Sequence, residues 1–262
     1  MIGRAYRTAQ ILSIDIVIGV VILLRFFCVQ FDVAPGWEAY VLLGGVVWLI
    51  YTADHLRDAE YKIRSSRERY LFHKDHRKPL VVVAGIVLIA LSILVLFIPL
   101  VIFLGGLALA VFSFAYLMMQ HRLSRFLSKE LYVALVYSAG ILMVPFLLSQ
   151  TYRWDIFLLL VLLTFVNLSL FSLYEKEDDI KDKFQSIATE LKGKKLKKII
   201  LLLISIGLSI AVLSINLITI YFIVGFVIYA LMIISSDWFR LNHRYRAIGD
   251  GVFLLPILFE WL

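Results

Sequence analysis

The chain has 262 residues, of which 62% are hydrophobic and 17% charged, and its formal net charge at pH 7 is +7. Soluble domains are only about half apolar, so this composition excludes an ordinary soluble protein and predicts a chain embedded in a lipid bilayer. The single cysteine excludes an internal disulfide and a zinc site built from cysteines. Because positive charge in a membrane protein usually reflects basic loops, we expect no nucleic-acid partner.

Apolar runs follow one another along the whole chain and predict nine membrane helices. Pro35-Gly36, Pro99 and Asn216 mark short connections between neighbouring runs. The remaining residues are too few for a soluble domain, so we predict one all-α polytopic membrane bundle covering residues 1–262. The runs lie at about 10–31, 36–53, 79–98, 99–119, 130–150, 154–174, 198–215, 217–235 and 247–262.

Basic residues predict the orientation of this bundle. Of the 26 Lys and Arg residues, 24 lie at the N-terminus or in every second connection. Basic loops stay in the cytoplasm, so we expect an integral protein of the cell inner membrane with a cytoplasmic N-terminus. The basic connections are 54–78, 120–129, 176–198 and 240–246.

Loop lengths predict an internal repeat. Long basic loops follow the second and sixth runs, and short ones follow the fourth and eighth. This pattern indicates two parallel four-helix halves plus a ninth helix. We expect the cytoplasmic loops 54–78 and 175–197 to cap a cavity between the halves.

Acidic pairs end the second and sixth runs. WLIYTADHLRDAE places Asp54 and Asp58 four residues apart, and NLSLFSLYEKEDDIKDK contains two pairs with the same spacing. Carboxylates at i and i+4 share one helix face and repel each other, and Mg²⁺ is the oxygen-seeking cation that would compensate them. One such pair alone is typical of a solvated helix end, whereas pairs at equivalent places in both halves favour a metal site. The second motif pairs Glu175 with Asp179 or Asp178 with Asp182.

Together with the segment HRKPL at 76–80, these motifs resemble the UbiA superfamily of intramembrane prenyltransferases. That family has nine helices, an Asn-x-x-x-Asp-x-x-x-Asp motif, an Arg-Pro-Leu-like segment before the third helix and a second Asp-x-x-x-Asp motif after the sixth. The resemblance implies Mg²⁺-dependent transfer of a prenyl group from an isoprenyl diphosphate to an aromatic or lipid-like, membrane-soluble acceptor. It implies Asp54, Asp58, Glu175 and Asp179 as catalytic metal-binding residues.

The sequence departs from the family pattern at three points. Ile50 stands where the family has Asn, which leaves Tyr51 as the nearest polar side chain. Lys78 replaces the family's arginine and keeps its charge but loses the bidentate fork. In the second motif, the pairing that begins at Glu175 aligns Ser186 with the family's Thr or Ser. The pairing that begins at Asp178 has the same spacing and stays open.

Cationic and polar side chains near the motifs are candidates to contact the diphosphate. An intramembrane polar residue such as Asn167 is a functional candidate, although an interhelical hydrogen bond explains it equally well. Basic loop residues, in turn, also set the topology. The candidates are Lys78, Arg57, Tyr51, Lys183 and Asn167.

Two other functions compete with prenyl transfer. A UbiA-type terpene cyclase would ionise the same diphosphate and need no acceptor. A transporter is the third possibility, and Asp15 inside the first run is consistent with it. Transporters, however, usually carry their charges near the bilayer midplane, whereas this chain concentrates its acids at one face.

Overall fold

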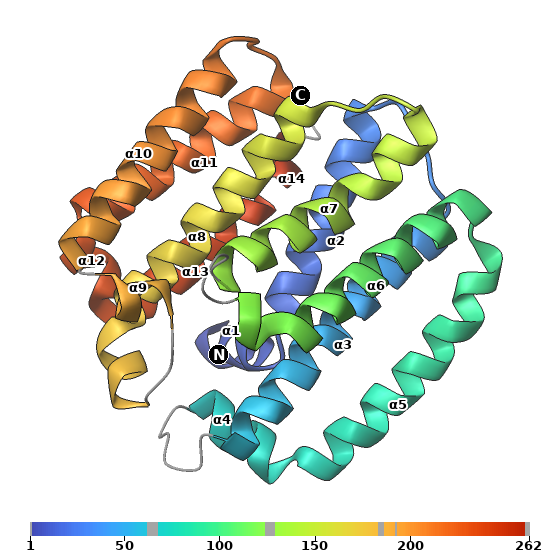
Figure 1. Cartoon of the computed structure of the whole chain (residues 1–262), viewed down its shortest axis with the longest axis horizontal. Coiled ribbons are helices and arrows are strands. Elements are labelled where there is room, and N and C mark those ends of the chain that lie inside the picture. Colours follow the sequence, from blue (N-terminus) through green and yellow to red (C-terminus); the bar gives the residue numbers. More distant parts are fainter. Residues whose placement is uncertain (1, 62–67, 124–128, 183–185, 192, 260–262) are drawn as a thin grey trace.

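The computed structural model describes residues 2–61, 68–123, 129–182, 186–191 and 193–259. These residues form an all-α bundle, as the apolar runs predict (Figure 1). The long helices are α2 (Ile14–Gln30), α3 (Trp37–Tyr61), α5 (Arg77–Leu94), α6 (Leu100–Leu123), α7 (Lys129–Ser149), α8 (Trp154–Lys181), α10 (Gly193–Val212) and α11 (Leu217–Ile234).

Shorter helices connect and cover the long ones. Among the described residues, five helical segments are long and apolar enough to cross a membrane, namely α3, α5 with its extension η1, α7, α8 and α11. The chain is therefore an integral membrane protein, and the total of nine spans stays a prediction. The short elements are α1 (Ile2–Ile11), α4 (Glu68–Asp75), η1 (Val95–Phe97), α9 (Ile187–Glu190), α12 (Ser236–Arg240), η2 (Leu241–His243), α13 (Arg244–Gly251), η3 (Val252–Leu254) and α14 (Pro256–Phe259).

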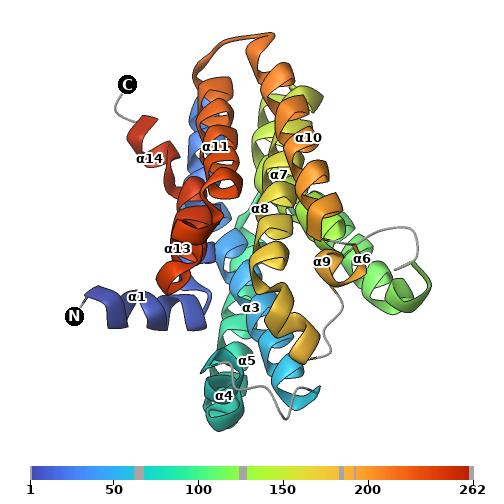
Figure 2. The same cartoon turned by 90° about the vertical axis from the view of Figure 1, so that its left-hand side faces the viewer.

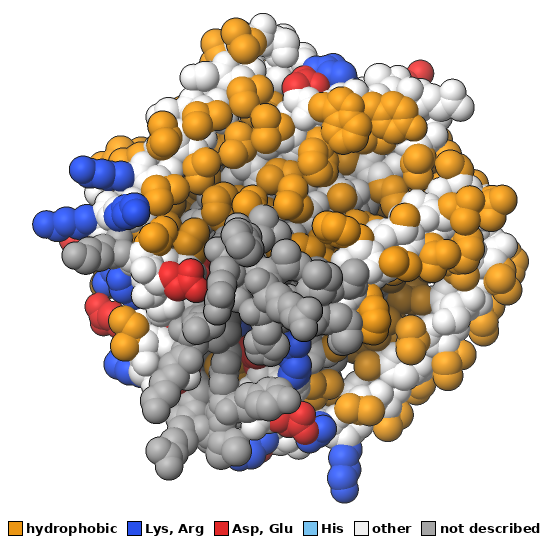
Figure 3. Space-filling model, viewed as in Figure 1, with side chains coloured by type: hydrophobic (Ala, Val, Ile, Leu, Met, Phe, Trp, Pro, Cys, Tyr) orange, Lys and Arg blue, Asp and Glu red, His pale blue; other side chains and the backbone are white. Residues whose placement is uncertain are grey.

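Helix α8 lies at the centre of the bundle. It packs against α7, α10, α11 and α13, and its apolar side chains contribute heavily to the main core. In contrast, α5 packs chiefly on α3 and buries only Leu80 and Leu91. Figure 3 shows apolar side chains over much of one face, which is hollowed between α5 and α6, while Lys and Arg gather along its left and lower edges. Such a surface suits a protein surrounded by lipid.

The two helices that carry the acidic motifs are longer than a membrane is thick. Helix α3 has 25 residues and α8 has 28, so they span about 37 and 42 Å against a hydrocarbon core of about 30 Å. Both finish at the same end of the bundle, called the motif end below (Figures 1 and 2). Each acidic motif therefore lies on a continuous helix that reaches past the apolar layer.

The N-terminal residues form a separate helix at the motif end. Ser13 adopts a left-handed backbone conformation with φ of 57°, which ends the first helical segment. Helix α2 consequently begins at Ile14, and α1 lies across the end of the bundle (Figure 2). Arg7 of α1 forms an ion pair with Glu68 of α4.

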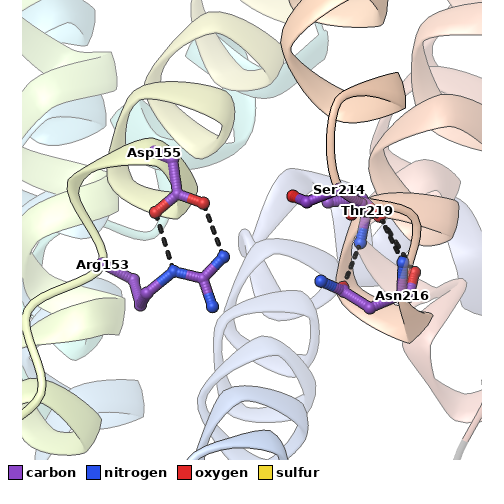
Figure 4. A network of polar contacts seen from close by, with 5 residues as sticks. All are labelled: Arg153, Asp155, Ser214, Asn216 and Thr219. Carbon is purple, nitrogen blue, oxygen red and sulfur yellow. Dashed lines mark hydrogen bonds and ion pairs between the residues drawn. The ribbon is translucent and has the colours of Figure 1, made fainter.

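Polar side chains interact in two places at the opposite end of the bundle (Figure 4). Arg153 binds Asp155 through two contacts, of 2.9 and 2.6 Å. Asn216 caps α11 by accepting from the Thr219 amide at 3.1 Å, so it breaks the apolar run where the sequence predicts. A cavity of about 280 Å³ lies at this end, lined in part by Arg153 and Ile218, and the acidic motifs do not contribute to it.

The last predicted span is broken into short segments. Residues 244–259 form α13, η3 and α14, which pack against α2, α8 and α11. Pro256 has no amide hydrogen to donate, and Gly249 and Gly251 have low helix propensity. This segment brings its polar residues against the central helix instead of crossing as one straight rod.

Small residues allow the helices to approach closely. A Cβ added to Gly207 of α10 would lie 2.4 Å from the ring of Phe226 on α11, a fully buried side chain. Close approach of backbones is a main source of helix association in lipid. A Cβ added to Gly85 of α5, in contrast, would meet nothing within 4 Å.

We therefore expect Gly207→Ala to destabilise the protein by about 1–3 kcal/mol through overpacking. Gly85→Ala is the matched control and should leave stability unchanged or slightly higher, because alanine favours helix. Thermal unfolding of both variants in the same detergent would measure the difference. Equal melting temperatures would contradict the close packing of α10 on α11.

Candidate functional site

The first acidic motif lies on the last turns of α3. Asp54 accepts a hydrogen bond from Arg57 at 3.1 Å and lies 3.9 Å from the ammonium group of Lys129 at the start of α7. Asp58 follows one turn later and is half-buried. The motif is thus partly neutralised by bases on its own helix and on a neighbouring helix.

The second motif presents its two candidate pairs to different surroundings. The side chain of Glu175 is 14% exposed and Asp179 is 4% exposed, so both face inward. Asp178 has a side chain that is 56% exposed and pairs with Lys181 on the outside of α8, while Asp182 is half-buried. A pair that acts on a substrate inside the bundle must face inward. The pair of Glu175 and Asp179 meets this requirement, whereas Asp178 does not.

The start of α7 contacts both motif regions. Lys129 approaches Asp54 of the first motif. The next residue, Glu130, accepts from the Ser172 hydroxyl of α8 at 3.1 Å and from the Ile187 amide of α9 at 2.8 Å. The start of α7 therefore contacts both motif helices, α3 and α8, and helps to fix their positions relative to each other.

An arginine from α13 binds the second motif. Arg246 donates to Glu175 at 2.6 Å, and the Tyr245 hydroxyl lies 3.3 Å from the same carboxylate oxygen. Tyr245 is stacked on Tyr174 with ring centroids 4.7 Å apart. Tyr174 in turn donates to the Met232 carbonyl at 2.6 Å. The contact of Arg246 with Glu175 was not predicted from the sequence, because residues 244–246 belong to a segment that was assigned as one of several basic loops.

A second polar group lies deeper in the bundle. Asp15 of α2 and Asp250 of α13 lie within electrostatic range of each other, and the Asn167 side chain of α8 contacts Asp250. Tyr51 of α3 lies within range of both acids and of Asp54. These residues form the interior polar cluster: Asp15, Tyr51, Asn167 and Asp250. Sequence analysis noted Asp15, Tyr51 and Asn167 separately, and the ionisable residue inside the last apolar run was the signal for Asp250.

The other predicted diphosphate contacts lie at the motif end. Arg57 pairs with Asp54, and Lys78 is exposed on the first turn of α5. The neighbouring Arg77 pairs with Glu60 near the end of α3, which holds the HRKPL segment close to the first motif. Lys183 lies outside the described residues.

The described part of the loop that follows the first motif packs on α3. His73 of α4 is buried, with its ring centroid 4.9 Å from that of His55, the residue after Asp54. Burial lowers the pKa of His73, so the ring is neutral at pH 7 and two adjacent imidazoles are tolerated. Near the second motif, Lys176 donates to the Leu191 carbonyl at 3.2 Å.

The carboxylates can hold Mg²⁺ only if a bound ligand supplies further oxygen atoms. Among the described residues, no group of three or more His, Cys, Asp or Glu side chains is arranged to hold a metal ion. Mg²⁺ commonly takes one or two carboxylates and completes its shell with water and substrate phosphates. Two-carboxylate motifs at one end of the bundle match that requirement, since a diphosphate would supply the remaining oxygens.

Comparison with known proteins agrees with these features. The family model described as the UbiA prenyltransferase family matches residues 39–255, a region that includes both acidic motifs and the HRKPL segment. The chain therefore belongs to the UbiA prenyltransferase family, which confirms the resemblance. Enzymes of this family are generally prenyltransferases and typically use Mg²⁺. No curated protein and no solved structure matches the chain.

Removal of Arg246 should leave Glu175 without its ion-pair partner inside the bundle. We expect Arg246→Met to lower the unfolding free energy by about 2 kcal/mol, because an inward-facing carboxylate then lacks its charged donor. Arg240→Met is the matched control, since Arg240 meets Glu177 at 4.0 Å on exposed surface. Thermal unfolding should also show partial recovery in Arg246→Met/Glu175→Gln. A stable single variant would contradict a structural role for the pair.

Proposed function

We propose that this protein is a Mg²⁺-dependent intramembrane prenyltransferase that ionises an isoprenyl diphosphate and transfers the prenyl group to an aromatic or lipid-like acceptor. The observation that carries this proposal is the presence of two acidic motifs at one end of one bundle, within a member of the UbiA family. Because 24 of the 26 basic residues lie at the N-terminus or in the connections on the motif side, we place this end in the cytoplasm.

In this proposal four acids of the two motifs bind the metal. Asp54 and Asp58 form one half of the clamp, and Glu175 and Asp179 form the other. The inward orientation of Glu175 and Asp179 supports this pairing over the one formed by Asp178 and Asp182. When bound, Mg²⁺ neutralises the diphosphate leaving group and holds it in place.

Bases around the motifs assist the leaving group. Arg57 and Lys78 contact the departing diphosphate, and Tyr51 replaces the polar contact that Ile50 does not provide. Arg57 already pairs with Asp54, so a small movement would transfer its donors to phosphate oxygens. Arg246 and Tyr245 orient the Glu175 carboxylate and act through it, as hydrogen-bonding partners of metal ligands commonly do.

The rest of the bundle protects the reaction and admits the lipid chain. A carbocation must be kept from water, and the core around α8 is apolar and closely packed. The exposed apolar face of α5 and α6 gives the isoprenoid tail a route from the bilayer.

Product analysis would test this reaction directly. Purified protein in lipid nanodiscs would receive Mg²⁺, allylic diphosphates of several chain lengths and a panel of acceptors. A prenylated acceptor supports the proposal. A cyclised hydrocarbon or alcohol without acceptor indicates a terpene cyclase instead, and the absence of any released diphosphate favours a transporter.

Loss of one metal-binding carboxylate should stop turnover. We expect Asp54→Ala and Asp179→Ala each to lower kcat by about 10²–10³-fold or more, since each removes electrostatic stabilisation of the leaving group. The matched control is Glu177→Ala, because Glu177 lies on the same helix as Asp179 and is 80% exposed. Diphosphate release measures the rate. Full activity in Asp54→Ala or Asp179→Ala would rule out the metal clamp.

A second comparison should identify the pairing used in the second motif. Glu175→Ala should reduce kcat by about 10²-fold or more. Asp178→Ala, which changes an outward-facing acid paired with Lys181, should stay within a few-fold of the wild type. A larger loss in Asp178→Ala, measured under the same conditions, would instead assign the metal to Asp178 and Asp182.

A further inference from the structure

Two acids of the interior polar cluster lack a cationic partner. Asp15 lies within electrostatic range of Asp250, and like charges in a poorly solvated interior repel strongly. Arg246 lies within electrostatic range of both acids and Arg69 within range of Asp15, but the ion pair of Arg246 goes to Glu175. None of the ion pairs found among the described residues involves Asp15 or Asp250.

Two oxygen atoms of this cluster are buried and have no hydrogen-bond donor. The Asn167 side chain is 3% exposed, and its Oδ1 atom has no hydrogen-bond partner. The buried Oδ1 atom of Asp15 also has none. Buried polar atoms are paired in most proteins, so orphaned ones require an explanation such as a ligand.

The position of Asn167 is fixed by its neighbours on α13. A Cβ added to Gly249 would lie 2.8 Å from Asn167 Oδ1 and 2.6 Å from the ring of Phe171. Only glycine lets α13 approach α8 this closely, and the next residue is Asp250. The amide oxygen and the two carboxylates therefore lie on α8, α13 and α2, and α13 packs against both of the other helices.

The cluster adjoins the proposed diphosphate site. Tyr51 lies within electrostatic range of Asp15, Asp250 and Asp54. Because Tyr51 lies about one turn before Asp54 on α3, the interior acids are close to the first motif. A group bound at the interior acids would lie on the membrane side of the reacting diphosphate.

We propose that Asp15, Asp250 and Asn167 bind the prenyl acceptor, and that they select neutral acceptors with hydrogen-bond donors, such as hydroxyl groups, against acceptors bearing a carboxylate. This inference rests on the proposed function and assigns Asn167 to the acceptor instead of the diphosphate. Hydroxyl groups can donate to the orphaned oxygens, whereas a carboxylate has no proton to donate and would add a negative charge beside the two acids.

The test uses two aromatic probes that differ at one group. Hydroquinone carries two hydroxyl groups, and 4-hydroxybenzoate carries one hydroxyl and one carboxylate. Equilibrium dialysis with full-length protein in nanodiscs, without any prenyl donor, gives the Kd of each probe. We expect the Kd of hydroquinone to be at least tenfold lower, which corresponds to about 1.4 kcal/mol.

Variants would assign this preference to the acids. Asp250→Asn and Asp15→Asn keep the side-chain shape and remove one negative charge each, and each should reduce the preference at least threefold. Because these residues lie on different helices, a folding defect in one leaves the other as the test. Ser169→Ala is the matched control, since it changes another buried and unpartnered polar atom of α8 and should keep the preference.

The outcomes separate this inference from the proposed function. Equal binding of the probes, tighter binding of 4-hydroxybenzoate, or an unchanged preference in both Asp variants would overturn the acceptor assignment. Diphosphate release is measured independently in the same preparations with Mg²⁺ and an allylic diphosphate. Its absence would overturn the prenyltransferase proposal while the Kd ratio still decides the acceptor site.

Discussion

The excess length of two helices is the constraint on which the candidate site depends. A charged carboxylate is costly in hydrocarbon, so metal-binding acids must lie at the water boundary while remaining part of a rigid frame. Helices α3 and α8 meet both needs, because each continues as a helix beyond the apolar layer. Rigid supports favour precise sites, since a ligand carried by a helix keeps its direction. The acids thus lie beyond the apolar layer without being moved onto loops.

Packing around α8 connects this end to the rest of the bundle. The same helix carries core residues along most of its length and the second motif at its end. Glu130 and Arg246 reach this helix from α7 and α13, which are distant in sequence. A change in the packing of α7 or α13 would therefore shift the carboxylates of the second motif as well as lower the overall stability.

Much of the fold was accessible from sequence because lipid imposes simple rules. Apolar runs, Pro99 and Asn216 predicted helices and breaks that the structure contains, and the acidic spacing led to the family that the comparison confirms. The separate helix α1 and the broken last segment were not predicted, since the left-handed φ of Ser13 does not follow from its residue type and Gly249 acts through its close packing on α8. The Glu175–Arg246 pair and the meeting of Asp15 with Asp250 join residues far apart in sequence. A single sequence holds no information on such pairings.

The peripheral position of α5 has a consequence for evolution. Only Leu80 and Leu91 of this helix are buried, and Leu91 sits over Gly45 of α3, where an added Cβ would approach it to 2.8 Å. Beyond the first turn, where Arg77 pairs with Glu60, most of the remaining side chains of the helix are exposed and would meet lipid tails, which distinguish poorly between one apolar residue and another. Selection on α5 then acts through hydropathy and not through shape. In relatives of this protein its outer positions should drift freely among Val, Ile, Leu and Phe, while Leu91 and Gly45 change together or not at all.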